Sequence, residues 1–113
     1  MTSSKENSMK TNQPGVVLRF QAKPGKGDEL FQLCNDLHFT GDPDGPVDWS
    51  LNRDDSNPDV MWAFEFYRDQ ESFDRHYSNQ QLDEPHQRVF DLLADEEGLD
   101  PSMRVDVHVA FTS

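Results

Sequence analysis

The arrangement of hydrophobic and polar positions along the chain predicts four strands and two helical regions. Residues 16–22 are a run of mainly β-branched and aromatic side chains that is followed by Pro24 and Gly25, as in a strand that ends in a turn. Residues 26–39 place apolar side chains at positions i, i+3, i+4 and i+7, beginning at Leu30. This is the spacing of an amphipathic helix, so the first two elements are predicted to be a strand and a helix.

A hairpin is predicted in the middle of the chain. Residues 47–52 alternate apolar and polar side chains, which is typical of a strand with one buried face. Residues 60–67 are apolar on both faces until Glu65. The residues between them, 53–59, are mostly turn formers (RDDSNPD). The two strands are therefore expected to pair with each other.

A second helical region and a last strand complete the pattern. Asp69 is the expected N-cap of a helix that carries His76 on its apolar side. This helix is expected to break near residues 78–79 and to restart after Asp83, where a proline in the first turn is tolerated. Residues 102–111 alternate again and predict the final strand.

The predicted order, β-α-β-β-α-β, is that of the ferredoxin-like fold. In that topology the first and third strands are central and the other two lie at the edges. The sequence agrees, because the first and third predicted strands are apolar on both faces whereas the second and fourth alternate. The expected fold class is therefore α+β, with a four-stranded antiparallel sheet that is covered by helices on one face.

The other face of this sheet is predicted to be uncovered. Alternation places Phe64 and Phe66 on the helix side. The uncovered face is expected to carry Val17, Arg19, Gln21, Asp48, Ser50, Asn52, Met61, Ala63, Glu65, Tyr67, Asp106, His108 and Ala110. Its apolar part is more than a monomer usually leaves in water. We therefore predict a homodimer in which two copies of this face pack together.

The composition adds an acidic surface to this picture. The chain has 113 residues, which suits a single domain. We expect a flexible N-terminal tail at residues 1–15 and the folded domain at residues 16–113. The formal net charge of −12 disfavours nucleic acid and membranes as partners, because nucleic acid and anionic membranes both require a basic face. A salt-loving host and a well-solvated surface would each explain this charge.

The sequence also disfavours several kinds of site. Cys34 is the single cysteine and lies in a helical apolar stripe, so it is expected in the core, with no disulfide and no cysteine metal cluster. The four histidines lie on different predicted elements, so no metal site is expected. The segment "KPGKG" is far shorter than a P-loop. With neither a membrane span nor a signal peptide in the sequence, a soluble cytoplasmic protein is expected.

Two histidines are the candidates for catalysis. His76 and His86 both lie on apolar stripes of the second helical region and are expected to face the sheet. Imidazole titrates near neutral pH, so either residue could act as a base or as a hydrogen-bonding group in a pocket. The alternative for each is a hydrogen-bonded histidine that fixes a helix to the sheet.

Aromatic residues are the candidates for a pocket wall, because flat aromatic surfaces suit a planar ligand. The candidates beneath the helices are Trp49, Trp62, Phe20, Phe31, Phe64 and Phe90. The alternative is that they form an ordinary core. Asn52 and His108 are polar candidates on the other face of the sheet. Glu65 and Tyr67 are expected to be polar anchors on this dimer-facing side, with Glu65 paired to Arg19.

Three stretches of the sequence resemble the antibiotic biosynthesis monooxygenase (ABM) domain family. They are "VVLRFQAKPGKGDELFQL", "DGPVDWSLNRDDSNPDVMWAFEFYRDQESFDRHYSN" and "FDLL". The resemblance includes a strand that ends in Glu-x-aromatic, here Glu65 and Tyr67. It also includes a helix with an aromatic residue three positions before a histidine, here Phe73 and His76. It covers roughly residues 16–111.

The resemblance implies a dimeric α+β barrel in which each subunit holds a small pocket between sheet and helices. The members that give the family its name oxidise polycyclic aromatic phenols to quinones with O2 and without metal, flavin or haem. Relatives degrade haem, and others isomerise a phosphorylated quorum signal. The fold alone therefore does not identify the reaction.

The haem-degrading branch is disfavoured by the sequence. Its members use an Asn on the first strand and a Trp and a His ten residues apart on the second helix. The first strand here has no Asn. His86 fits the histidine position, but His76 stands where the tryptophan is required.

We therefore expect a monooxygenase that needs no cofactor and oxidises a small aromatic ligand, such as a phenol, quinol or anthrone, with O2. His76 or His86 would assist deprotonation, and Trp49 and Trp62 would shape the pocket. The alternatives are a non-catalytic small-molecule-binding or stress-related dimeric barrel, and an isomerase of a small metabolite. The cavity beneath the helices distinguishes them, because converging basic side chains would favour a phosphorylated ligand and a closed core would favour a structural role.

Overall fold

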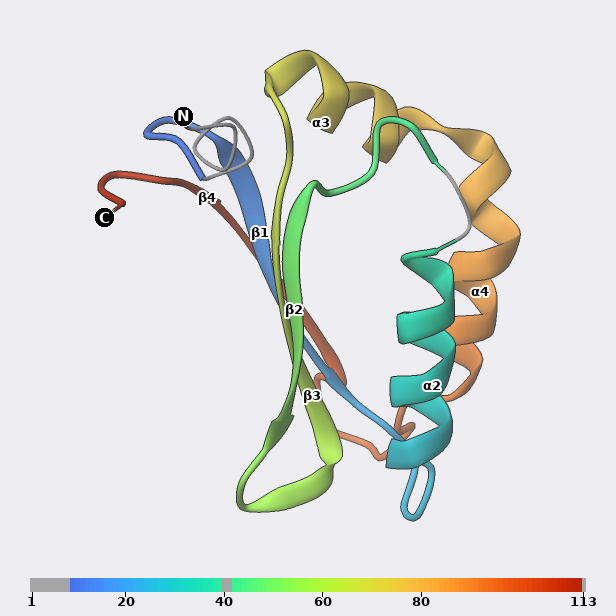
Figure 1. Cartoon of the computed structure of the whole chain (residues 1–113). Helices are drawn as coiled ribbons and strands as arrows, with labels where there is room; N and C mark the ends of the chain where they lie inside the picture. Colours follow the sequence, from blue (N-terminus) through green and yellow to red (C-terminus); the bar gives the residue numbers. More distant parts are fainter. Residues whose placement is uncertain (1–8, 40–41, 113) are drawn as a thin grey trace.

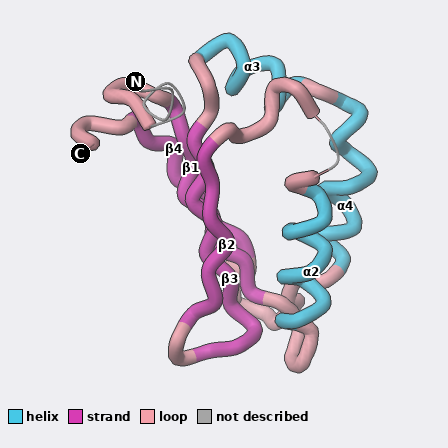
Figure 2. Tube along the Cα trace, in the orientation of Figure 1, coloured by secondary structure: helices cyan, strands magenta, loops and turns pink. Residues whose placement is uncertain are grey.

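The protein, described here from a computed structural model, folds into one layer of strands and one layer of helices (Figures 1 and 2). The structure describes residues 9–39 and 42–112. The strands are β1 (Pro14–Gln21), β2 (Asp48–Asp54), β3 (Asn57–Phe66) and β4 (Ser102–His108). The helices are α2 (Gly27–Leu37), α3 (Gln70–Ser78), the short 3-10 helix η1 (Gln80–Leu82) and α4 (Asp83–Asp91). The predicted order of elements is confirmed, including the break in the second helical region.

The sheet has the predicted topology. Its strand order is β2-β3-β1-β4, and each neighbouring pair is antiparallel. The first and third strands are therefore central, as the apolar character of both their faces indicated. The helices lie on one side of the sheet, and no helix of the described chain covers the other side (Figure 1). The fold class is ferredoxin-like α+β.

The folded part of the chain begins before residue 16. Pro14 is the first residue of β1, and the backbone N–H of Asn12 donates to the carbonyl of Val109 at 2.6 Å. The side-chain amide of Gln13, which is buried, donates to Asp48 on β2 at 3.2 Å. The first part of the expected flexible tail, residues 1–8, lies outside the described residues.

Local signals in the sequence position the helices. The carboxylate of Asp69 accepts a hydrogen bond from the backbone N–H of Ser72 at 2.8 Å, which confirms the predicted N-cap of α3. At the start of α2, Asp59 of β3 accepts from the backbone N–H of Gly27 at 3.0 Å. A Cβ atom at position 27 would lie 2.1 Å from the carbonyl oxygen of Pro58, so only glycine permits this close approach. The start of α2 is thus fixed against the hairpin that ends in β3.

The faces of the two later strands are the reverse of those predicted. Phe64 of β3 lies opposite both Ser50 of β2 and Val17 of β1, and Val17 lies opposite Val105 of β4. Directly paired residues share a face of the sheet, so all four lie on the uncovered face. The predicted faces of β1 and β2 are confirmed. The predicted faces of β3 and β4 are wrong, because the side chains assigned to each face lie on the opposite one. Phe66, predicted on the helix side with Phe64, lies on the uncovered face with it.

The corrected register has a physical cause. β3 is central and apolar on both faces, so its alternation carried no information about which side faces the helices. A shift of one residue moves every side chain to the opposite face. Met61, Ala63, Glu65 and Tyr67, assigned to the uncovered face, therefore point toward the helices.

The core lies between the sheet and helices α2 and α4. Its buried residues are Ala22, Leu30, Cys34, Met61, Val89 and Leu93. Phe31 packs against this cluster, which fits its alternative interpretation as a core residue. Cys34 is buried as expected, and burial raises the pKa of its thiol to about 12, so it remains protonated at neutral pH.

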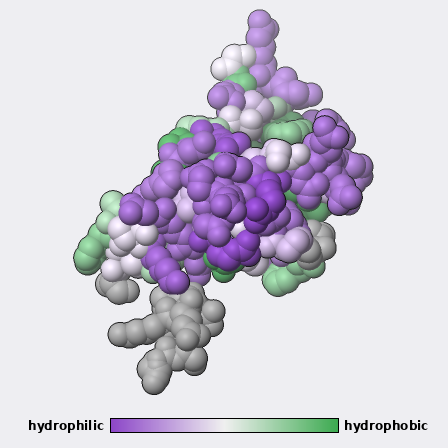
Figure 3. All heavy atoms as spheres, turned by 90° about the horizontal axis from the view of Figure 1, so that it is seen from above, coloured by the Kyte–Doolittle hydropathy of each residue, from purple (hydrophilic) through white to green (hydrophobic). Residues whose placement is uncertain are grey.

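The uncovered face is more apolar than predicted. Its apolar side chains include Val17, Trp62, Phe64, Phe66, Met103, Val105 and Val107. Phe64 is 40% exposed and Val105 is 46% exposed. By contrast, hydrophilic residues dominate the molecule seen from the α3 end (Figure 3). Within the described residues, no helix is long and apolar enough to cross a membrane.

Candidate functional site

A cavity of about 390 Å³ lies between the sheet and the helices. Its apolar wall is mainly aliphatic, with Leu18 and Met61 from the sheet, Leu37 from α2, and two phenylalanines, Phe20 and Phe90. Its polar lining consists of His38, Asp42, Glu65, His76, Tyr77, Asn79, Asp83, His86, Ser102 and Arg104. The cavity therefore combines an apolar pocket with several groups that can move protons.

Glu65 and His38 form a buried pair in this lining. Nε2 of His38 lies 2.7 Å from Oε2 of Glu65, and the two side chains are only 10% and 9% exposed. Nδ1 of His38 lies 2.8 Å from the carbonyl oxygen of Cys34, one turn earlier in α2. The ring stacks on Trp49 with centroids 4.1 Å apart. These contacts fix the imidazole on three sides.

The pKa of His38 is raised by these surroundings. Burial lowers this pKa. The hydrogen bonds to Glu65 and to the carbonyl of Cys34, together with the charge of Glu65, raise it by more, so the net shift is upward. His38 directly follows the last residue of α2, where the negative end of the helix dipole also favours a cation. The pair therefore retains a proton to higher pH than an ordinary histidine does.

Two tyrosines extend this pair. The hydroxyl of Tyr67 lies 3.3 Å from Oε1 of Glu65 and 3.4 Å from the hydroxyl of Tyr77. Burial and the Glu65 charge raise the pKa of Tyr67, and burial raises the pKa of Tyr77. Both phenols are therefore protonated near neutral pH. Tyr67 is fully buried, whereas Tyr77 reaches the cavity.

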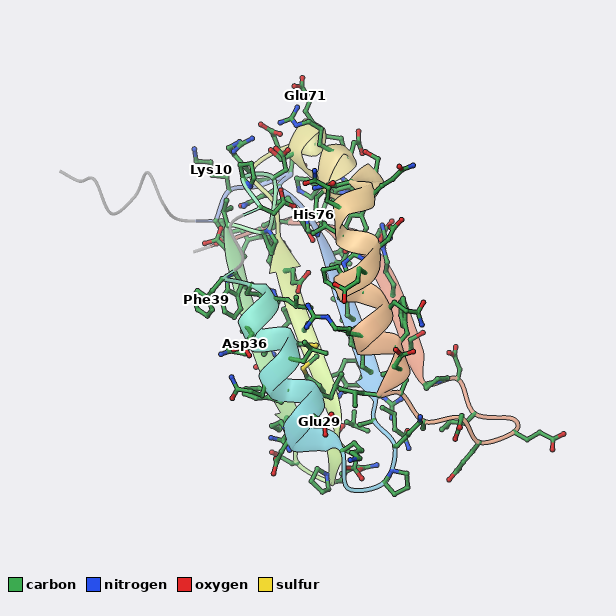
Figure 4. The ribbon with its side chains drawn as sticks, turned by 90° about the vertical axis from the view of Figure 1, so that its right-hand side faces the viewer. Lys10, Glu29, Asp36, Phe39, Glu71 and His76 are labelled. Atoms are coloured by element: carbon green, nitrogen blue, oxygen red, sulfur yellow. The ribbon has the colours of Figure 1, made fainter. Side chains whose placement is uncertain are left out.

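His76 forms a second carboxylate–histidine pair in the same cavity. Its Nδ1 lies 2.6 Å from Oδ2 of Asp42, and both side chains are 13% exposed. In the neutral imidazole the proton on Nδ1 is donated to Asp42, which leaves Nε2 as the acceptor. Figure 4 shows His76 between α3 and the sheet, whereas Glu71 of the same helix points away. His76 is therefore placed to accept a proton inside the cavity.

The loop that carries Asp42 is held against α3 by further ion pairs. Asp44 contacts Arg75 at 2.9 Å and Arg68 at 3.6 Å. The hydrogen bond to Arg75 holds the pKa of Asp44 below its ordinary value. These contacts keep the loop, and with it Asp42, beside His76.

His86 on α4 also lines the cavity. Burial, and secondarily the neighbouring His76, lower its pKa, so its ring is neutral at neutral pH. Within the described residues its ring has no side-chain hydrogen bond. His86 is thus a second histidine with a free nitrogen in the cavity, without the carboxylate that orients His76.

Arg104 of β4 is the one lysine or arginine among the described lining residues. Its Nε donates to Asp106 at 2.8 Å, and its guanidinium carbon lies 3.8 Å from the ring centre of Tyr77. Its charge is therefore already paired. Within residues 9–39 and 42–112, no group of three or more His, Cys, Asp or Glu side chains is arranged to hold a metal ion.

Several predicted site residues lie elsewhere. Trp62, Phe64 and Asn52 are on the uncovered face and outside the cavity. Trp62 Nε1 instead donates to Asp54 at 3.0 Å, and Asn52 donates to the carbonyl of Trp62. Trp49 is on the helix side but reaches the site only through His38. The corrections for Trp62 and Phe64 follow from the orientation of β3, whereas Asn52 was already assigned to the uncovered face.

The predicted dimer-facing anchors are corrected as well. Glu65 and Tyr67 are buried beneath the helices and do not lie on the uncovered face. Glu65 is paired with His38, and Arg19 instead lies over the Trp62 ring at 5.8 Å on the opposite face. His108 contacts Gln70 of α3 at 3.3 Å, which places it on the helix side.

His38 and Asp42 were not among the site residues predicted from the sequence. A signal for His38 existed, because it lies four residues after Cys34 and eight after Leu30 and so continues the buried stripe of α2. Glu65 also gave a signal, since a carboxylate within an apolar strand requires a partner. Asp42 lies in a loop, and its approach to His76 depends on tertiary structure alone.

The chain resembles known proteins in sequence and in fold. The family model for "Antibiotic biosynthesis monooxygenase" matches residues 15–98. A search of curated proteins found no significant match.

Solved structures resemble the whole domain. A conserved protein from Methanosarcina mazei Go1 is 22% identical, with a TM-score of 0.69 over 88% of this chain and 94% of its own. Rv0793 from Mycobacterium tuberculosis is 20% identical, with a TM-score of 0.69 over 88% and 97%. A provisionally assigned antibiotic biosynthesis monooxygenase from Caulobacter crescentus CB15 is 17% identical, with a TM-score of 0.70 over 96% and 99%. At these identities the likeness establishes the fold.

Proposed function

Because the chain belongs to the antibiotic biosynthesis monooxygenase family, we propose that it oxidises a small, uncharged phenol, quinol or anthrone with O2 and without a cofactor. The observation that carries this proposal is the Asp42–His76 pair in the cavity. The pair places a base next to an apolar pocket. A base and a pocket that excludes water are the two features that such a reaction requires from a protein.

The lining of the cavity supports an uncharged substrate. Asp42, Glu65 and Asp83 contribute carboxylates, whereas the single arginine, Arg104, is already paired with Asp106. An anionic or phosphorylated ligand would meet more negative than positive charge there. This lining disfavours the isomerase alternative for phosphorylated metabolites, and a volume of about 390 Å³ is within the range of small-molecule sites.

The chemistry begins with loss of a proton. Nε2 of His76 accepts a proton from the phenol or from the acidic CH2 of the substrate, and Asp42 stabilises the imidazolium that forms. The resulting electron-rich anion transfers an electron to O2, and the two radicals combine to a peroxide on carbon, which takes the proton from the His76 imidazolium and becomes a hydroperoxide. Loss of water from the hydroperoxide then gives the carbonyl. For a CH2 group the balance is CH2 plus O2 giving C=O plus H2O.

We also propose that the active form is a homodimer that is assembled through the uncovered face. This face exposes Phe64 and Val105 beside Val17 and Met103, a contiguous apolar surface on neighbouring strands. Packing it against a second copy would remove this surface from water. The bases of the site lie on the opposite side of the sheet, so assembly does not obstruct the cavity.

The test is O2 uptake with a panel of anthrones and hydroquinones. We expect wild type to consume O2 and to form the corresponding quinone, and His76→Gln to lower kcat by about 10²–10⁴, the usual contribution of a general base. His86→Gln determines whether the second free histidine contributes. His108→Gln, outside the cavity, is the matched control and should leave the rate unchanged.

If wild type consumes no O2 above background with any member of the panel, the proposal fails. If His86→Gln and not His76→Gln abolishes the reaction, the base is assigned incorrectly. Binding of the same compounds without O2 uptake would favour the alternative of a non-catalytic binding protein.

A further inference from the structure

The proton between His38 and Glu65 takes no part in the deprotonation described above, and we propose that this pair is the proton donor of the reaction. The inference rests on the proposed function, because it assigns a second role within the same cavity. His76 and Asp42 would accept the substrate proton, and His38 and Glu65 would deliver a proton to the oxygen that leaves.

The hydrogen bonds of His38 determine where its protons are. The carbonyl of Cys34 can only accept, so Nδ1 of His38, at 2.8 Å, must carry a hydrogen. Nε2 then faces Oε2 of Glu65 at 2.7 Å. Two bare lone pairs would repel at this distance, so one proton lies between them. The pair is either an imidazolium with a carboxylate or an imidazole with a carboxylic acid, and in both forms it has one proton to give.

The surroundings keep this proton in place. Trp49 covers one face of the imidazole, and the pair is about 90% buried, so exchange with bulk water is restricted. The other titratable groups that interact with the pair are the Cys34 thiol, the phenols of Tyr67 and Tyr77, and His86. The thiol and the phenols remain protonated at neutral pH, and the pKa of His86 is lowered whereas that of His38 is raised, so none of these groups removes the proton from the pair.

The proposed step is the breakdown of the hydroperoxide. His76, neutral again after it has protonated the peroxide, removes the remaining hydrogen on the carbon, the electron pair of that C–H bond forms the carbonyl, and the O–O bond breaks. The outer oxygen leaves with a proton from the His38–Glu65 pair and becomes water. The proton now held by His76 returns to the pair across the cavity that both pairs line, so one O2 yields one carbonyl and one water. Both pairs line the same cavity, which allows one bound molecule to meet them in turn.

The variant that isolates this role is Glu65→Gln. An amide at position 65 can still donate a hydrogen bond to Nε2 of His38, but neither partner then has an acidic proton to release. Deprotonation by His76 does not involve Glu65, so the variant should still form the hydroperoxide, and the readout is what becomes of that hydroperoxide. Because a general acid contributes about 10²–10⁴-fold, the ratio of organic hydroperoxide to quinone should rise at least about tenfold. His108→Gln is the control and should give the wild-type ratio.

A second measurement does not depend on a stable variant. In the ¹⁵N NMR spectrum of wild type, both ring nitrogens of His38 should be in contact with a proton at neutral pH, with a low-field proton signal from the Nε2–Oε2 contact. A signal from Nε2 of a bare, neutral imidazole would overturn the proposal.

The outcomes separate the two proposals. Normal O2 uptake by Glu65→Gln with an unchanged hydroperoxide-to-quinone ratio overturns the donor role and leaves the proposed function standing. Absence of O2 uptake by wild type overturns both.

Discussion

The two faces of the sheet differ in what they carry, although the same strands supply both. On β3, Glu65 points into the cavity and is paired with His38, while its neighbours Phe64 and Phe66 point to the uncovered face. Buried polar side chains with hydrogen-bonding partners thus lie on the helix side of the sheet. Partly exposed apolar side chains lie on the uncovered face. Alternation along one strand thus separates the face that lines the cavity from the face through which we propose that two subunits associate.

The difference is also energetic. A buried charged pair costs desolvation and stabilises only while both partners are present. An exposed apolar side chain costs little in a monomer and contributes when a second surface covers it. Substitutions on the cavity face should therefore affect the stability of the subunit, whereas those on the uncovered face should affect the association of subunits.

The largest effect is expected from Glu65→Ala. It leaves His38 buried without its partner, which should lower the free energy of unfolding by about 3–5 kcal/mol. Asn52→Ala on the uncovered face removes only partly exposed hydrogen bonds and should cost about 1 kcal/mol or less. Urea denaturation of the two variants checks the comparison. Equal losses would contradict the division between the faces.

The next effect concerns assembly. Phe64→Asp places a charge in the centre of the uncovered face, where burial of an unpaired charge in an interface costs several kcal/mol, so the proposed dimer should weaken at least about 100-fold. Sedimentation velocity at micromolar concentration measures this change. Glu71→Gln, on the outer side of α3, is the control. Wild type that sediments as a monomer would refute the proposed dimer.

A smaller effect concerns pH. The pKa of His38 is raised in the folded state, so its stabilisation is fully present below its unfolded value of about 6.5 and is lost as pH rises through the folded pKa. The difference in unfolding free energy between wild type and His38→Asn should therefore decrease as pH rises above 6.5. His86, whose pKa is lowered, is present in both proteins and cancels in this difference. A difference that grows with rising pH would contradict the assignment.

The smallest effect is expected from Asp69→Ala. Loss of the N-cap of α3 should cost about 1 kcal/mol in the free energy of unfolding. Oligomeric state should be unchanged, because Asp69 lies on neither face of the sheet. Thermal unfolding followed by circular dichroism, together with sedimentation, checks both expectations.

The fold could be predicted from the sequence because the patterns that indicate its helices and strands are local. Apolar spacing identified α2, Asp69 identified the start of α3, and the character of the strands identified which of them are central. These features depend on residues a few positions apart, which a sequence displays directly.

The site was harder to predict from the sequence, because it depends on which face of each strand points inward and on contacts between distant segments. A central strand that is apolar on both faces does not reveal its inward side, so Glu65, Tyr67, Trp62 and Phe64 were placed on the wrong faces. The Asp42–His76 pair joins residues 34 positions apart through a loop, for which no periodic signal exists. His76 and His86, found on helical stripes, do reach the cavity.

The most direct test of the account is the fate of oxygen during turnover. With ¹⁸O2 and an anthrone, wild type should place one ¹⁸O atom in the new carbonyl and the other in water, and His76→Gln should form little product of any kind. A carbonyl oxygen that derives from labelled water instead of O2 would contradict the proposal that this cavity performs monooxygenation.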